Sequence, residues 1–391
     1  MSLDYQTREK CIITEEADLE SLYTIKDFPV FIGCTDQPKH TDIKKDMDVF
    51  ISRSSGVIQL KKLLPLDTVY SAFHSEAVGK VWEDHYNYFS DFVLKHRSSN
   101  SILEMGGSNA RLAKLCINKK PDLEWTIVEP NPDPLNKTPL NRIKVISSFI
   151  EDQLDLLSTG STFVHSHVLE HLYQPLTTLK AITKRSRQGD KMIFSVPNLY
   201  KYLKNNFVNT INFEHTYFLT ENVLDFLMKK LGYKTIQKQY YQEHSIFYAV
   251  EYVGCSGNIL KGIGLNYYFE YKKLYLEFIK NIENEVIKLN TAIKNYIHEE
   301  KNKNPRVFIF GAHIFSQFLI NFGLQTKNIE AIIDNSKKKI GKRLYGTDLR
   351  VMSPDILRDG KTALVILKAG QYQSEIEDQL MQISKEVKIV S

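Results

Sequence analysis

One short stretch of this 391-residue chain constrains its fold more than any other: SILEMGGSNARLAKL, residues 101–115. An apolar run ends in two glycines, and a helical pattern begins directly after them. In doubly wound α/β domains a strand, a glycine turn and a helix follow one another in this order, and the turn holds a cofactor against the free N–H groups of the helix. We therefore expect a cofactor site at this turn.

The segments that follow alternate between strand and helix patterns, which predicts a parallel sheet with helices on both faces and an α/β fold class. Strands are predicted at 101–107, 124–131, 143–149, 161–168 and 190–198, and helices at 109–120, 175–186 and 220–233.

The sequences before and after this region have different residue patterns. Residues 1–75 look irregular, with short β-like runs at 29–33 and 57–60, whereas residues 265–303 contain no proline or glycine and predict one or two long helices. A second strand and helix alternation starts near residue 306. We therefore expect four parts: a small N-terminal substrate-binding module (1–75), a cofactor-binding domain (76–258), a helical linker (259–303) and a Rossmann-like C-terminal domain (304–391).

Composition excludes several classes of protein. The net charge is +5 and the basic residues are scattered, so the densest basic run, NSKKKIGKR (335–343), is interpreted as a solvated loop rather than a nucleic-acid patch. No apolar run reaches the length of a membrane span or resembles a signal peptide, and four dispersed cysteines do not make a disulfide framework. We expect a cytoplasmic protein with neither a nucleic-acid nor a membrane partner.

The glycine turn itself indicates which cofactor it holds. It contains Glu104, Gly106, Gly107, Ser108 and Asn109 and lacks the G-x-G-x-x-G spacing of a dinucleotide site. The acid Glu104 would sit badly beside a pyrophosphate, but it suits a cationic amino group such as that of the methionine part of S-adenosylmethionine. We therefore predict S-adenosylmethionine as the cofactor.

Later strand ends supply the remaining cofactor contacts. Glu129 ends the second strand, where a carboxylate can accept hydrogen bonds from both ribose hydroxyls. After the third strand, Phe149 and Ile150 could sandwich adenine. Ser166 and His167 end the fourth strand and are expected near the methionine part of the cofactor.

This ordered set of motifs, followed by FSVPN (194–198), resembles the class I S-adenosylmethionine-dependent methyltransferases. Over nearly its whole length the chain also resembles the three-part sugar C-methyltransferases of deoxysugar biosynthesis. The strongest match outside the cofactor domain is FGA (310–312) and IIDNSKKKIGKRLYGTDLRVMSP (332–354). The resemblance implies a nucleotide-linked sugar as substrate and a C-terminal domain that closes over it, with a homodimer as a further possibility.

The resemblance also implies a zinc-binding N-terminal module, and here the sequence departs from the family. The family carries two C-x-x-C pairs, but this chain has Cys11 followed by Thr14, and then Ser52 and Ser55. Hydroxyl groups are poor zinc ligands compared with thiolates. We expect the shape of the module without its metal.

Three closely spaced histidines do not change that expectation. His165, His167 and His171 look like a metal-binding group, but the spacing of His167 and His171 suits a metal only on a helix, and no third ligand is evident nearby. No metal ligand is therefore predicted.

The family places a Y-x-E-H motif beside the sugar, after the fifth strand. In NTINFEHTYFLT (209–220), Glu214 and His215 match this motif, while Asn212 stands at the position of the tyrosine. The resemblance implies that His215, supported by Glu214, is the general base. It also implies that Tyr70 takes the role of the tyrosine of the N-terminal module.

The chain lacks the motif tyrosine and the zinc ligands of the family, which weakens the case for methylation of a carbon atom. We therefore favour O-methylation of a sugar hydroxyl over C-methylation of a nucleotide-linked keto-sugar. Two other classes stay open: a nucleic-acid or protein methyltransferase, and a non-catalytic module that only binds the cofactor.

Overall fold

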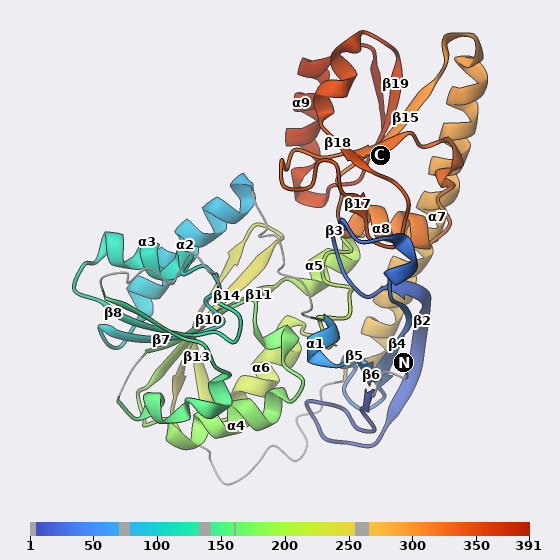
Figure 1. The fold of residues 1–391 in the computed structure, drawn as a ribbon. Helices are drawn as coiled ribbons and strands as arrows, with labels where there is room; N and C mark the ends of the chain where they lie inside the picture. The colour runs from blue at the N-terminus through green and yellow to red at the C-terminus, as the bar shows by residue number, and fades with distance from the viewer. Residues whose placement is uncertain (1–4, 70–78, 133–141, 160–161, 255–265) are drawn as a thin grey trace.

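The structure is a computed structural model that describes residues 5–69, 79–132, 142–159, 162–254 and 266–391. Its largest unit is a seven-stranded sheet with the order β13-β14-β11-β10-β7-β8-β9 (Figure 1). In this sheet β14 is antiparallel to both of its neighbours, while β9, β8, β7, β10 and β11 pair in parallel. The strands are β7 (Ser101–Met105), β8 (Glu124–Val128), β9 (Ile143–Ile146), β10 (Thr162–Ser166), β11 (Lys191–Pro197), β13 (Tyr233–Tyr241) and β14 (Ser245–Tyr252).

Helices cover both faces of this sheet, as the α/β alternation predicted. Alternate residues of β11 show the two faces, because Ile193 belongs to one apolar cluster and its neighbours Met192 and Phe194 belong to another. The first cluster includes α2 (Lys80–His96) and α3 (Arg111–Lys119), and the second includes α4 (Pro175–Arg185) and α6 (Glu221–Lys230). The predicted doubly wound α/β fold class is confirmed.

The N-terminal segment is more regular than its sequence suggested. It contains an antiparallel sheet in the order β12-β5-β4-β2, in which β2 (Leu19–Pro29) and β4 (Lys44–Ser52) are long strands. The irregular interpretation of this region was wrong, because β4 buries alternate residues such as Met47 and Val49 while charged residues between them mask the apolar pattern. The strand expected at 29–33 was also wrong, since β2 ends at Pro29.

Two neighbouring strands of this sheet are far apart in the sequence. β5 (Ile58–Leu60) was predicted, and it pairs with β12 (Tyr217–Phe218), which follows the fifth strand of the large sheet by some distance in sequence. The N-terminal sheet is therefore completed by a segment of the cofactor-binding domain.

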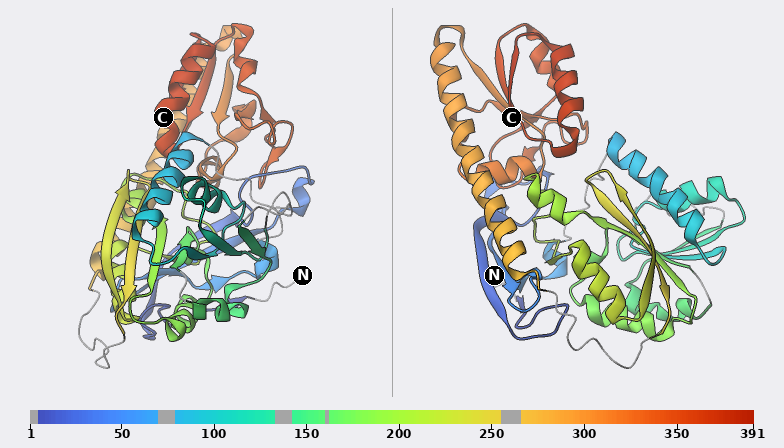
Figure 2. Two further views of the ribbon diagram at one scale, coloured as in Figure 1. Left: turned by 90° about the vertical axis from the view of Figure 1, so that its left-hand side faces the viewer. Right: turned by 180° about the vertical axis from the view of Figure 1, so that it is seen from behind.

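A single helix, α7 (Tyr268–Glu299), fulfils the prediction of one or two long helices and connects the cores. Its first half contributes Tyr271 and Phe278 to the large apolar cluster, and its second half contributes Leu289 and Ile293 to the cluster of the C-terminal unit. Figure 2 shows this helix running beside the N-terminal sheet and up to the C-terminal unit. None of the helices in the described ranges is long and apolar enough to span a membrane.

The C-terminal unit is a second parallel sheet, in the order β18-β16-β15-β19-β20, as expected for a Rossmann-like domain. A two-residue pairing of β3 (Cys34–Thr35) with β17 (Arg343–Leu344) joins it to the N-terminal module. Beside this pairing, the Arg343 guanidinium makes two hydrogen bonds of 2.6 Å to the Asp42 carboxylate. The other elements of the unit are β15 (Arg306–Phe310), α8 (Ile314–Asn321), β16 (Ala331–Ile333), β18 (Val351–Met352), β19 (Ala363–Leu367), α9 (Gln373–Ile383) and β20 (Val387–Val390).

Candidate functional site

The two glycines after β7 bring three strand ends together. Gly106 has a φ of +75°, and a Cβ atom on it would lie 2.4 Å from Cγ2 of Val168, just beyond β10. A Cβ atom on Gly107 would lie 2.6 Å from Cγ2 of Ile127 in β8. Both positions therefore need glycine, because the turn packs directly against the neighbouring strand ends.

Glu104 lies beneath this turn rather than at its surface. Its side chain is 3% exposed, and Nε1 of Trp125 donates a 2.7 Å hydrogen bond to its Oε2. Burial raises the pKa of Glu104 to about 8, so the carboxyl group is protonated at neutral pH in the free protein. The predicted role of Glu104 toward a cationic amino group therefore requires it to lose a proton when the cofactor binds.

Glu129 and Ser108 are predicted contacts from two different strand ends, and the structure brings them together. The Ser108 amide donates to Oε2 of Glu129 at 3.2 Å, and the Asn131 amide donates to Oε1 at 2.9 Å. Asn109 is tied to its own helix, since its Oδ1 accepts a 3.0 Å hydrogen bond from the Arg111 amide. The half-buried Glu129 carboxylate thus stands at the edge where a ribose was expected.

Phe149 and Ile150, the two predicted adenine contacts, differ in exposure. Ile150 begins a short 3-10 helix and is 4% exposed within the large apolar cluster. Phe149 is 51% exposed, so it is the one of the pair whose ring can stack on a base. The chain turns inward between the two residues to complete the core, and the adenine sandwich stays a prediction.

Ser166 and His167 end β10, as predicted, but their side chains have different surroundings. Oγ of Ser166 is buried and has no hydrogen-bond partner within the described ranges. His167, with a φ of +54°, hydrogen-bonds Oγ of Ser245 through its Nε2 at 3.0 Å. Its ring lies 5.0 Å from the centre of the Trp82 ring. His167 therefore faces α2 and β14.

Trp82 stands at the centre of a group of three histidines. His85, His167 and His244 each have a ring centre within 5.1 Å of that of Trp82. One ring nitrogen of each histidine lies within 4.8 Å of those of the other two. His85 hydrogen-bonds Oγ of Ser195 at 2.9 Å, and His244 hydrogen-bonds Oγ of Ser245 at 2.6 Å.

A second group contains the predicted base. Glu170, His171 and His215 each offer one nitrogen or carboxylate oxygen within 4.8 Å of those of the others. The rings of His171 and His215 lie 4.7 Å apart, edge to face. Nδ1 of His215 donates to the Thr210 carbonyl oxygen at 2.8 Å, which leaves a lone pair on Nε2. Burial lowers the pKa of His215, which favours this neutral form.

Sequence reasoning missed Glu170, although it lies between His167 and His171 in SHVLEHL (166–172). It also found no third ligand for His167 and His171. The structure supplies one for each histidine from a distant segment, and His167 and His171 fall into different groups. Their separation follows from the fold, because Leu169–His171 form a short 3-10 helix instead of an α-helical turn.

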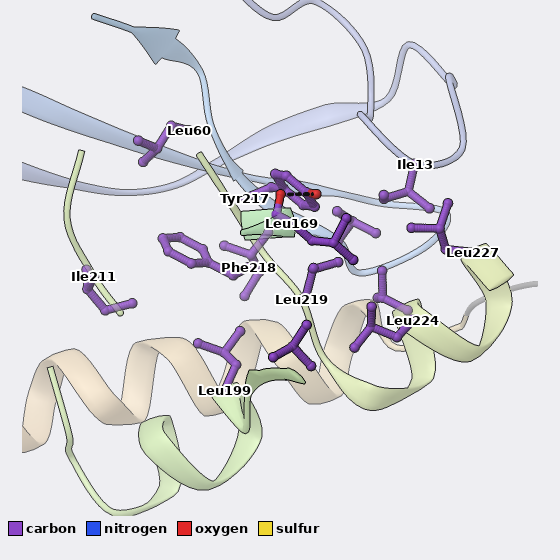
Figure 3. Close-up of a cluster of buried hydrophobic side chains, with 14 of the residues drawn as sticks. Ile13, Leu60, Leu169, Leu199, Ile211, Tyr217, Phe218, Leu219, Leu224 and Leu227 are labelled. Carbon is purple, nitrogen blue, oxygen red and sulfur yellow. Dashed lines mark hydrogen bonds between the residues drawn. The ribbon is translucent and has the colours of Figure 1, made fainter. Parts of the chain in front are cut away.

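Two hydrogen bonds hold the segment of His215 against that of Glu170. The Thr216 amide donates to the Glu170 carbonyl oxygen at 2.9 Å, and the Tyr217 hydroxyl donates to the Leu169 carbonyl oxygen at 2.5 Å. Figure 3 shows Tyr217 and Leu169 inside an apolar cluster that also holds Leu60 of the N-terminal sheet. The position of His215 therefore depends on the N-terminal module.

Asn212 takes over a backbone role at the position of the family tyrosine. Its Oδ1 accepts hydrogen bonds from the amides of Glu214 (2.9 Å) and His215 (3.0 Å) and so fixes this turn. Burial raises the pKa of Glu214 to about 7. The third predicted catalytic residue, Tyr70, lies outside the described residues.

The four positions that correspond to family zinc ligands meet in the N-terminal module. Sγ of Cys11 lies 3.6 Å from Oγ of Ser55, which donates to Oγ of Ser52 at 2.7 Å, and the Thr14 amide donates to Sγ of Cys11 at 3.4 Å. One thiol and three hydroxyls do not suit zinc. Hydrogen bonds join these side chains, and we derive no metal chemistry from them.

The C-terminal unit approaches the cofactor domain at one loop. A Cβ atom on Gly79, at the start of α2, would lie 3.0 Å from the Tyr372 ring, and one on Gly370 would lie 3.6 Å from Phe207. Asp334, which follows β16, already has hydrogen-bond partners. Its oxygens accept hydrogen bonds from the Ala312 amide (2.8 Å), Lys339 Nζ (3.0 Å) and the Ser336 amide (2.8 Å).

Comparison with known proteins gives one family match. Residues 269–390 match the family described as C-methyltransferase C-terminal domain, which covers α7 and the C-terminal unit. The family match therefore lies outside the seven-stranded sheet. No curated protein matches the chain.

Several solved structures are similar to parts of the chain. An O-methyltransferase family protein from Burkholderia thailandensis has 10% identity and a TM-score of 0.35, over 45% of this chain and 57% of that one. A SAM-dependent methyltransferase from Archaeoglobus fulgidus has 18% identity and a TM-score of 0.34, over 40% and 72%. The N-methyltransferase NodS from Bradyrhizobium japonicum has 13% identity and a TM-score of 0.31, over 44% and 97%. This chain therefore spans little more than half the length of the first of these structures.

Proposed function

We propose that this protein transfers the methyl group of S-adenosylmethionine to a hydroxyl of a nucleotide-linked sugar. The observation that carries the proposal is the contact between Gly106 and Val168. Through it, the cofactor turn touches the segment that continues into Glu170 and His171. The donor side and the acceptor side of a methyl transfer are thereby neighbours at the carboxyl edge of one sheet.

The reaction needs an aligned donor and a group that takes the acceptor proton. Nε2 of His215 has the lone pair for this task, because Nδ1–H is directed to the Thr210 carbonyl oxygen. As the proton of the sugar hydroxyl passes to Nε2, the hydroxyl oxygen attacks the methyl carbon. The bond from that carbon to sulfur breaks, its electron pair stays on sulfur, and S-adenosylhomocysteine leaves.

A nucleotide-linked sugar suits the two parts that flank the cofactor domain. The N-terminal sheet contains β12, which begins two residues after His215, and the loop at Gly370 and Tyr372 of the C-terminal unit reaches the start of α2. Elements of both flanking parts therefore border the region where the acceptor would bind. This favours a substrate larger than a simple alcohol.

C-methylation of a nucleotide-linked keto-sugar is the second candidate. It is favoured by the description of the matched family, C-methyltransferase C-terminal domain. Against it stands Asn212, whose amide oxygen already binds two backbone amides at the position where the family has a tyrosine. An enolate intermediate needs a donor to stabilise its negative oxygen, and a phenol at this position would supply one.

The test is a methyl-transfer screen over nucleotide sugars with a mass-spectrometric readout. O-methylation requires a product whose added methyl group is an ether, and fragmentation of the product locates it. C-methylation requires exchange of the hydrogen beside the ketone in D2O, with S-adenosylhomocysteine in place of the donor. Methylation of keto-sugars alone, accompanied by that exchange, would select the second candidate.

A further inference from the structure

The carboxylate of Glu170 lacks the partners that a buried acid needs. The side chain is 3% exposed, and neither of its oxygens has a hydrogen-bond partner among the residues that the structure describes. The nearest basic atom is Nδ1 of His167, 3.5 Å from Oε1, and this contact is an ion pair only when His167 is protonated. A buried carboxylate in this state is costly unless a cation lies beside it.

The side chains around Glu170 are suited to hold such a cation. We propose that Glu170, His171 and His215 bind one divalent transition-metal ion, with Zn²⁺ as the first choice and Mn²⁺ or Co²⁺ as substitutes. Two imidazoles and one carboxylate with ligand atoms within 4.8 Å of one another form a common three-ligand set for such ions. The sequence expectation of no metal considered only neighbouring histidines, whereas His215 comes from another segment.

The surroundings of His215 support a ligand role. A metal-bound histidine typically donates its other ring N–H to a carbonyl or carboxylate oxygen, and Nδ1 of His215 does so to the Thr210 carbonyl oxygen at 2.8 Å. The bond from the Thr216 amide to the Glu170 carbonyl oxygen fixes the two ligand segments relative to each other. The ligand set is thus held in place by the fold before any ion arrives.

The neighbouring group of His85, His167 and His244 is a weaker candidate. Each of these histidines already hydrogen-bonds a serine hydroxyl, either Ser195 or Ser245, through one of its ring nitrogens. No buried charge in that group lacks a partner. It therefore serves as the matched control for a test of the Glu170 group.

Three protein ligands leave a further position on the ion, and the acceptor oxygen would bind there. This part rests on the proposed function. A metal-bound hydroxyl has a lowered pKa and releases its proton to water, and the resulting oxygen anion attacks the methyl carbon as the bond to sulfur breaks. His215 then acts as a ligand and is no longer needed as a base.

The test uses the full-length protein after chelator treatment and dialysis. Calorimetric titration with Zn²⁺, and with Co²⁺ for its visible spectrum, is expected to give one site per chain. Glu170→Gln, His171→Ala and His215→Ala should each weaken binding by about tenfold or more, on the scale of a lost ligand or ligand support. His244→Asn and Cys11→Ser should retain the site, which separates it from the other histidine group and from the N-terminal module.

Two results would overturn the metal site: wild-type protein that binds no stoichiometric ion, or equally tight binding by Glu170→Gln and His171→Ala that are folded by circular dichroism. The catalytic part is tested separately with a sugar found in the screen. Full methyl transfer by the chelated protein would refute that part and leave the proposed function intact. Metal binding without transfer to any nucleotide sugar would refute the proposed function and leave the metal site intact.

Discussion

Gly106 lies so close to Val168 that a methyl group on its Cα would approach Cγ2 of Val168 to 2.4 Å. This contact joins the turn after β7 to the segment after β10, and so fixes the cofactor side of the site against the acceptor side. Both residues belong to the carboxyl edge of adjacent parallel strands. The closeness of the two segments can be tested by enlarging one partner and reducing the other.

Gly106→Ala should destabilise the protein by about 1–3 kcal/mol, because alanine both resists a φ of +75° and collides with Val168. Urea unfolding measures the loss. Adding Val168→Ala to the Gly106→Ala protein should recover part of it, whereas Val168→Ala alone should destabilise. Equal stability of Gly106→Ala and wild type would show that the two segments are not in contact.

Glu129→Ala should weaken S-adenosylmethionine binding by several fold to about a hundredfold, which corresponds to roughly 1.5–3 kcal/mol for a charge-assisted hydrogen-bond pair. Calorimetry gives the affinity. Glu124→Ala is the control, because Glu124 is exposed at the opposite end of the same strand. Unchanged affinity in Glu129→Ala would remove this residue from the cofactor site.

The stability of the free protein should fall as the pH rises from about 5 to 8, in part because of Glu104. Its pKa is about 8 in the folded state against an ordinary value of 4.5. Over this range the folded protein keeps a proton that the unfolded chain releases, so rising pH favours unfolding, by on the order of 3–5 kcal/mol in total. Thermal unfolding of Glu104→Gln should show a flatter pH dependence, since glutamine stays neutral.

The protonation of the Glu104 carboxyl group can also be tested by measuring cofactor binding. If Glu104 faces the amino group of S-adenosylmethionine, binding at pH 7 must release its proton. The heat of binding would then differ between buffers of different ionisation enthalpy, and Glu104→Gln would abolish the difference. If the heat of binding in the wild type did not depend on the buffer, Glu104 would not release a proton to the cofactor site, and its role would be the hydrogen bond with Trp125.

His215→Ala should lower kcat by about 10²–10⁴ and leave S-adenosylmethionine affinity nearly intact, because the cofactor contacts come from earlier strands. The same direction is expected whether His215 acts as a base or as a metal ligand. Glu214→Gln should have a smaller effect. His298→Ala, an exposed histidine of α7, controls for nonspecific change. Wild-type turnover in His215→Ala would place proton removal elsewhere.

The sequence placed Glu129 and Ser108 at the ends of two predicted strands. Glu129 and Ser108 could be paired in advance because the carboxyl ends of adjacent parallel strands meet at one edge. Glu170 could not be assigned in the same way. Its neighbours arrive through the bond between Thr216 and the Glu170 carbonyl oxygen, which joins segments far apart in the sequence.

The errors in the fold prediction have a similar origin. β4 was missed because the charges of KKDMDVFIS hide an alternation that becomes visible only when β2 and β5 lie beside it. β13 and β14 were also not predicted, and β13 has a largely polar sequence, YKTIQKQYY. The burial of Ile150 was not predicted, because it depends on residues of the large apolar cluster that are distant in the sequence.

The pairing of β5 with β12 links the docking of the N-terminal module to the position of His215. Tyr217 and Phe218 pair with Gln59 and Ile58 of the N-terminal sheet, and His215 lies two residues before this strand. If the N-terminal module separated from the cofactor domain, it would either lose its edge strand or draw His215 away from Glu170. The acceptor-side residues are therefore complete only while the module is docked, and a truncated chain that begins after β5 would carry every acceptor-side side chain without the strand that aligns them.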